Sequence, residues 1–202
     1  MIANDSMTQA NKNKIFRGLA GWMIFVSLAG AMAYLFYFDT YHFAVVQDGV
    51  LYRMGMRNTR ELENVIRRVH PKTIVCLVTD QEIQTGNHGD FQGEFAVLKK
   101  SGIALERIPM REDHAPTQAQ IDDFLHIVTD KNNQPVIVHC AQGVVRTGMM
   151  VAAYQQRVLG YDEQKALNEV EIFGKGAERG QEVRDFIHQY YADLNRQVAA
   201  TQ

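Results

Sequence analysis

The chain has 202 residues, of which 46% are hydrophobic and 22% charged, a composition typical of a globular protein. The formal net charge of −2 gives no sign of the clustered basic face that nucleic-acid-binding proteins present. The two cysteines fit neither a Cys-x-x-Cys nor a Cys/His metal spacing, so we expect no structural zinc site and no redox dithiol.

The first feature along the chain is an apolar run over residues 18–38 that contains no charged side chain. A run of this length predicts a helix long enough to cross ~30 Å of hydrocarbon. The preceding tail, residues 1–17, carries three basic residues close to the run, Lys12, Lys14 and Arg17. By the positive-inside rule, we expect a single-pass membrane protein with a cytoplasmic tail. Residues 39–202 would then form a non-cytoplasmic domain, periplasmic in a Gram-negative bacterium.

The same run has a second interpretation, a cleaved signal peptide. Ala31, Met32 and Ala33 have the small-residue spacing of a cleavage site. The run continues past Ala33 to Phe38 and its basic region is long, so the sequence favours an uncleaved anchor.

The first elements of the remaining chain are a hairpin, a helix and a buried strand. Two short strands are expected over Phe43–Gly55, around the turn Asp48-Gly49. Apolar residues with helical spacing over 58–70 predict an amphipathic helix, with Asn58 as its N-cap. Lys72–Asp80 is rich in β-branched residues and predicts a buried strand.

Strands and helices then alternate to the end of the chain. The expected elements are a helix over Phe91–Ser101, a strand over Ile103–Met110, a helix from Pro116-Thr117, a strand over Gln134–Cys140, and helices over Arg146–Leu159, Asp162–Phe173 and Glu182–Arg196. This alternation predicts an α/β fold with a central, mainly parallel sheet flanked by helices.

The stretch "VIVHCAQGVVRTGMM" carries the chemistry. A buried strand ends at Cys140 and a helix begins near Arg146, so the loop between them presents unpaired backbone amides to one point. Such a set of amides, aided by the helix dipole, binds an anion. Gly143 permits a backbone conformation that a side chain would obstruct, and the Arg146 guanidinium fits phosphate oxygens. The same positive environment is expected to lower the pKa of the Cys140 thiol.

The segment His139–Gly148 matches the His-Cys-x-x-Gly-x-x-Arg-Ser/Thr-Gly signature at every fixed position. It therefore resembles the cysteine-based protein tyrosine and dual-specificity phosphatases, especially compact bacterial members. The resemblance extends from about Phe43 to about Phe173, because "DGVLYRMG", "KTIVCLVTD" and "GIALERIPMREDHAPT" look like further segments of these enzymes in the same order.

This resemblance implies a metal-independent, cofactor-free phosphatase. Cys140 would attack phosphorus and form a cysteinyl-phosphate. Thr147 would donate its hydroxyl to the sulfur when the thiolate leaves, and His139 would orient the loop. The equatorial phosphate oxygens would be held by the Arg146 guanidinium and by the backbone amides of Ala141, Gln142, Gly143, Val144, Val145 and Arg146.

The leaving group needs a proton, which these enzymes take from an aspartate on an earlier loop. Asp113 in "REDHAPT" is the best match, with Glu112 and Asp90 as alternatives. Without the signature, Asp113 would be read as a turn residue at a helix entry. Cys76 is expected to fill the core, and a protective disulfide with Cys140 is the alternative.

The substrate class follows from the variable positions of the loop. Ala141, Gln142, Val144 and Val145 are uncharged, which favours phosphotyrosine or another single phosphate monoester over a highly charged inositol phosphate. Phosphoserine and phosphothreonine stay open. The expected partners are a phosphorylated protein and, through the N-terminal helix, a membrane. The alternatives are a phosphate-binding pseudophosphatase and a sulfurtransferase.

Overall fold

A computed structural model describes residues 17, 19–32, 34, 40–86, 89–170 and 178–200 of the chain. The chain separates into two compact units, Met1–Asp39 and Thr40–Gln202. Each unit is described by itself.

The prediction of a transmembrane helix over 18–38 is wrong. Within the described part of the chain, no helix combines the length and the apolar character that crossing a membrane requires. The predicted fold class is therefore wrong about its N-terminal transmembrane helix. The predicted single-pass topology, with a cytoplasmic N-terminus and a non-cytoplasmic domain, is wrong for the same reason, because it depends on that helix.

The second unit is built on a five-stranded mixed sheet with the order β1-β2-β5-β3-β4. Its strands are β1 (Ala44–Gln47), β2 (Leu51–Gly55), β3 (Thr73–Cys76), β4 (Ala104–Arg107) and β5 (Val136–Cys140). β1 and β2 form the antiparallel hairpin, and Gly49 in its turn has the positive φ of 71° that glycine favours. The pairings of β2 with β5, β5 with β3 and β3 with β4 are parallel.

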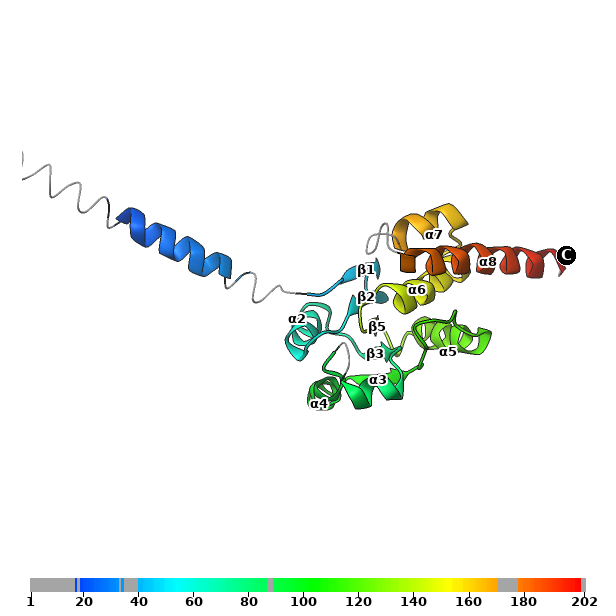
Figure 1. Cartoon of the computed structure of the whole chain (residues 1–202), viewed down its shortest axis with the longest axis horizontal. Coiled ribbons are helices and arrows are strands. Elements are labelled where there is room, and N and C mark those ends of the chain that lie inside the picture. The colour runs from blue at the N-terminus through cyan, green and yellow to red at the C-terminus, as the bar shows by residue number, and fades with distance from the viewer. Residues whose placement is uncertain are drawn as a thin grey trace, which may run out of the picture. The chain divides into compact units, whose positions relative to one another are not determined.

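Helices cover both faces of this sheet, as an α/β architecture requires (Figure 1). They are α2 (Thr59–Val69), α3 (Asp80–Thr85), α4 (Phe91–Ser101), α5 (Gln118–Thr129), α6 (Val145–Arg157), α7 (Glu163–Val170) and α8 (Glu178–Ala200). One core packs α2, α3 and α4 against β2, β3 and β5, and includes Leu62, Ile74 and Ile137. The other packs α5 to α8 on the opposite face, and includes Val138, Phe124 and Ile187.

The sheet topology brings the candidate site to one edge. β5 is central, and its carboxyl end at Cys140 lies between those of β2 and β3. Loops that follow parallel strands meet at this edge, where open α/β sheets bind their ligands. Strand β3 is shorter than expected, because the chain leaves the sheet after Cys76 and begins helix α3 at Asp80.

Candidate active site

The loop between β5 and α6, residues 140–146, is called the phosphate loop here. Gly143 has a φ of 72°, and a Cβ atom at this position would lie 2.4 Å from the carbonyl oxygen of Met54. A side chain would therefore be strained and would also clash with strand β2. Val144 is the N-cap of α6 and provides no side-chain cap, which leaves the first-turn amides of the helix available to an anion.

The Cys140 sulfur lies inside this loop. Its Sγ accepts a hydrogen bond from the Gly143 amide at 3.2 Å, and the residue is 3% exposed. Burial acts to raise the pKa of the thiol, but the Arg146 charge and the groups of Thr147 and Gly143 outweigh burial, so the pKa is lowered. The sulfur therefore has the environment of a thiolate nucleophile.

Thr147 occupies the first turn of α6 next to this sulfur. Its side chain is fully buried, and its hydroxyl lowers the pKa of Cys140. Within the described residues, no other group takes up this hydroxyl, so its donor is available to the sulfur. A buried hydroxyl that keeps its donor available is suited to stabilise negative charge on the sulfur.

Arg146 is held by a carboxylate that the sequence analysis did not identify. Its two terminal nitrogens each lie 2.8 Å from an oxygen of Glu82, in a bidentate pair, and its Nη1 also donates to the Met110 carbonyl at 3.1 Å. The Arg146 side chain is 2% exposed. Such a fork fixes the plane of the guanidinium and hence the direction of its remaining donors.

Helix α3 places Glu82 at this point. Thr79 and Glu82 form a capping box, in which each side chain bonds the backbone amide of the other residue. The Thr-x-x-Glu spacing was the available sequence signal. The helix was missed because its six residues are too few to show an apolar periodicity.

We expect Glu82→Gln to lower kcat/KM by about 100-fold, because the amide keeps one acceptor and lets the guanidinium rotate away from its productive position. Hydrolysis of p-nitrophenyl phosphate by the full chain measures this loss. Glu63→Gln, which alters an exposed glutamate on α2, is the control for charge. A Glu82→Gln protein with unchanged kcat/KM would show that Arg146 does not depend on this carboxylate.

His139 lies on the opposite face of the sheet from Cys140, in a buried polar cluster. Its Nε2 is 2.7 Å from Oε1 of Glu94 on α4, and its Nδ1 is 3.4 Å from the Cys140 carbonyl oxygen. Burial acts to lower the pKa of His139, but Glu94 and Cys76 outweigh it, so the pKa is raised. The imidazole is thus fixed behind the loop, where a positioning role fits better than acid–base chemistry. Glu94 was not identified from the sequence.

Cys76 belongs to this same cluster. The ligand atoms of Cys76, Glu94 and His139 lie within 4.8 Å of one another, and all three residues are buried. Cys76 pairs with His139 in the parallel register, so its side chain points away from the face that carries Cys140. Both thiols are free, and a disulfide between them does not fit this register.

The other loop residues are predicted to bind phosphate through their backbone amides, and their side chains differ in exposure. Ala141 is buried and its carbonyl accepts from the Met56 amide at 2.9 Å, whereas Gln142 is exposed. Val144 is half-buried and Val145 buried at the start of α6.

The three candidates for the general acid are placed differently. Asp90 is the N-cap of α4 and accepts from the Gly93 amide at 2.8 Å, which is a structural role.

The other two candidates lie on the loop after β4. Glu112 lies 3.3 Å from Arg146. Asp113 is exposed and accepts hydrogen bonds from Arg111, at 2.8 and 3.0 Å, and from His114; these hold its pKa well below the usual range. Glu112 and Asp113 both line a hollow of about 430 Å³ that also includes Glu82.

A strand-ending cysteine in an anion-binding loop, with an arginine at the start of the next helix, defines the class of cysteine-based phosphatases. The family model described as "DSP-PTPase phosphatase fused to NAD+ Kinase" matches residues 47–187, and the chain belongs to this family.

Individual relatives agree with this assignment. The dual specificity protein phosphatase TpbA of Pseudomonas aeruginosa (strain UCBPP-PA14) is 26% identical over 128 residues, which cover 63% of this chain and 53% of TpbA. The chain thus spans about half the length of this curated relative.

Solved structures share the fold. The catalytic core of Siw14 superimposes with a TM-score of 0.63 at 21% identity, covering 81% of this chain and 93% of Siw14. P. aeruginosa TpbA superimposes with a TM-score of 0.57 at 25% identity, covering 75% of this chain and 86% of TpbA.

Proposed function

We propose that this chain is a phosphatase that hydrolyses phosphate monoesters through a cysteinyl-phosphate on Cys140. The observation that supports it most strongly is the placement of the sulfur. Sγ is buried in a loop of backbone donors, bonded to the Gly143 amide and beside a guanidinium that Glu82 fixes. A thiolate at that position faces any phosphate that the loop amides and Arg146 bind.

The reaction takes two displacements at phosphorus. In the first, the Cys140 thiolate forms the S–P bond as the ester P–O bond breaks, and the leaving oxygen takes a proton. In the second, water attacks phosphorus and gives a proton to the acid–base residue that was deprotonated in the first step, while the S–P bond breaks and the thiolate is restored. Arg146 and the amides of residues 141–146 stabilise the equatorial oxygens in both steps, and Thr147 donates to the departing sulfur.

Asp113 is the proposed proton donor. In the arrangement described above it is ionised, because Arg111 and His114 hold its carboxylate. Its exposed loop allows the carboxyl to leave these partners and approach a bound phosphate dianion, whose negative charge raises the pKa of a nearby acid. The hollow that Glu112 and Asp113 line also includes Glu82, the partner of Arg146, so both acids lie on the side of the domain where the guanidinium is held.

We expect Asp113→Asn to lower kcat for a phosphotyrosyl peptide by about 100-fold and to remove the alkaline limb of the pH profile, since an amide donates no proton to the leaving group. Glu112→Gln is the matched variant on the neighbouring residue, and its loss should be smaller. A larger loss in Glu112→Gln than in Asp113→Asn would assign the acid to Glu112.

For the substrate we propose a single phosphate monoester, with phosphotyrosine first and phosphoserine or phosphothreonine also possible. The uncharged side chains at 141, 142, 144 and 145 support this choice, since a polyphosphorylated ring would need additional cations. One relative of the same fold was solved as P. aeruginosa TpbA in complex with pTyr, whereas S. cerevisiae SIW14 is named a PP-IP phosphatase.

A substrate panel tests this proposal directly. The full chain, in reductant and a metal chelator, is assayed with phosphotyrosyl, phosphoseryl and phosphothreonyl peptides and with an inositol pyrophosphate. The proposal requires the highest kcat/KM on a monoester peptide. A preference for the inositol pyrophosphate would overturn the substrate class but not the chemistry.

A further inference from the structure

The phosphate loop turns its carbonyl groups away from the anion site, and these carbonyls need donors of their own. Strand β2 and the residues beside it provide them. The Met56 amide donates to the Ala141 carbonyl at 2.9 Å, and Nη2 of Arg53 donates to the Gly143 carbonyl at 2.7 Å. His42 lies 2.7 Å from the Gln142 carbonyl through its Nδ1.

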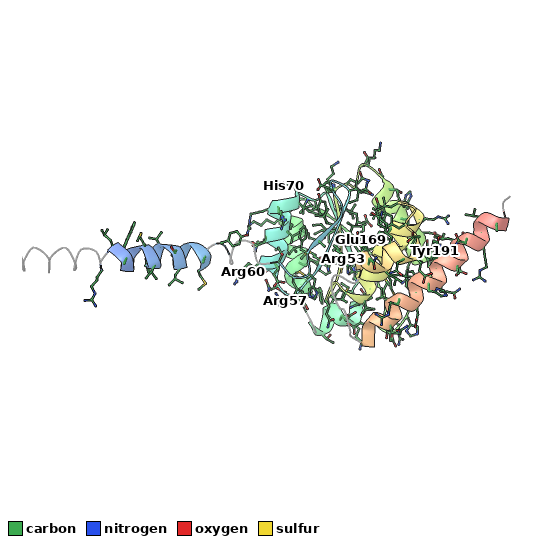
Figure 2. The ribbon with its side chains drawn as sticks, turned by 90° about the horizontal axis from the view of Figure 1, so that it is seen from above. Arg53, Arg57, Arg60, His70, Glu169 and Tyr191 are labelled. Carbon is green, nitrogen blue, oxygen red and sulfur yellow. The ribbon has the colours of Figure 1, made fainter. Side chains whose placement is uncertain are left out.

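Arg53 differs from the other donors because it is a buried cation. Its side chain is 1% exposed, and it lies within the body of the domain, whereas Arg57 and Arg60 lie at the side of α2 (Figure 2). In the parallel register it is opposite Val138, two residues before Cys140, so Arg53 and Cys140 project from the same face of the sheet. Burial lowers the pKa of Arg53 to about 10, and the charge of Cys140 acts against that shift.

The charges around the loop explain why a second cation matters. The titratable groups facing it are Arg53 from β2, Arg146 from α6, Glu82 from α3, Glu112 from the loop after β4, and His42 from the segment before β1, which contacts the exposed rim of the loop at Gln142. Arg146 and Glu82 together carry no net charge, and Glu112 adds a negative one at 3.3 Å from Arg146. The His139–Glu94 pair lies on the opposite face of the sheet and is also neutral as an ion pair.

A thiolate next to a phosphate dianion therefore needs positive charge beyond the Arg146–Glu82 pair. The N-terminus of α6 supplies a partial charge only. We propose that Arg53 is a positioning residue of the active site, which fixes the Gly143 peptide from behind and stabilises the Cys140 thiolate as a second buried cation. This inference rests on the proposed function of the loop and deepens it.

The test uses Arg53→Met and Arg53→Lys in the full chain. Alkylation of Cys140 by iodoacetamide is followed against pH by peptide mass spectrometry, alongside kcat/KM for p-nitrophenyl phosphate. Arg68→Met, an exposed arginine on α2, is the control for loss of one positive charge, and thermal unfolding checks that each variant is folded.

We expect Arg53→Met to move the alkylation midpoint to higher pH and to slow alkylation at about pH 6 by about tenfold, the effect of removing one nearby opposite charge. Its kcat/KM should fall by a similar factor, and Arg68→Met should match the wild type. Arg53→Lys keeps the charge, so the alkylation profile should return towards that of the wild type. A folded Arg53→Met with the wild-type alkylation midpoint would overturn the proposal.

If Arg53→Met does not fold, the proposal is tested by measuring the inhibition constant of orthovanadate for Arg53→Lys. The Gly143 carbonyl accepts from Nη2 at the end of the arginine side chain, a position that the shorter lysine does not reach with the same geometry, so the inhibition constant should rise by about tenfold while the thiol stays acidic. An unchanged inhibition constant would overturn the proposal. Failure of the proposed function gives a different result, because the wild type would then show no turnover whatever the Arg53 variants do to alkylation.

Discussion

Cys140→Ser is expected to lower kcat/KM for p-nitrophenyl phosphate by at least about 10⁴-fold, the loss typical of removing a covalent nucleophile. The lowered thiol pKa means that the sulfur is ionised at a pH where a serine hydroxyl stays protonated. The loop amides and Arg146 are untouched by the substitution, so the variant should still bind phosphate or orthovanadate. Loss of turnover with retained binding is the result that identifies a nucleophile.

Cys76→Ser is the matched control for this prediction. Cys76 is buried on the other face of the sheet, so its removal should leave turnover within a few-fold of the wild type. The pH dependence has a defined sign: as pH falls through the thiol pKa, the thiolate and with it kcat/KM are lost. Full activity in Cys140→Ser would exclude the cysteinyl-phosphate route, and an inactive wild type that still binds orthovanadate would indicate a phosphate-binding pseudophosphatase.

Arg146→Lys carries the second large expected effect, a loss of about 10³-fold in kcat/KM. Both terminal nitrogens of Arg146 donate to Glu82, and Nη1 also donates to the Met110 carbonyl. A lysine presents a point charge without this fork, so Glu82 loses one bond and the phosphate loses a planar, fixed donor. Because the missing interaction strengthens as charge develops on phosphorus, kcat should fall more than KM rises.

Arg157→Lys is the control for this substitution, because it lies at the other end of the same helix and is exposed. Thermal unfolding of Arg146→Lys separates a kinetic defect from a loss of stability, since Arg146 is buried. An Arg146→Lys protein with kcat within about threefold of the wild type would contradict the role given to the bidentate pair, which is stronger than a single charged hydrogen bond.

Local sequence patterns predicted much of the second unit. The hairpin around Asp48-Gly49, the helix over Phe91–Ser101 and the strand ending at Cys140 all lie where turn residues, caps and apolar periodicity place them. These signals act over a few residues, so one sequence reveals them. The place of the loop between β5 and α6 belongs to this group, because its cysteine, glycine and arginine have fixed offsets along the chain, whereas its binding of phosphate stays a prediction.

The residues that contact this loop, its arginine or the preceding histidine from other elements could not be predicted in the same way. Glu82, Glu94 and Arg53 act through contacts with residues 64, 45 and 90 positions away in the chain. Such pairings follow from the order of strands in the sheet, which periodicity does not reveal. The error in the N-terminal region has another cause: an uncharged run shows that residues are apolar, but a membrane span requires a helix that is both long and apolar enough, and the described residues contain none.

In the proposed reaction, Cys140 receives the phosphoryl group. The most direct test is a rapid acid quench of the full chain during turnover of p-nitrophenyl phosphate, followed by peptide mapping by mass spectrometry. We expect one phosphoryl group on the peptide that contains Cys140 and none in Cys140→Ser. A phosphoryl group on another residue, or steady turnover by Cys140→Ser at the wild-type rate, would contradict it.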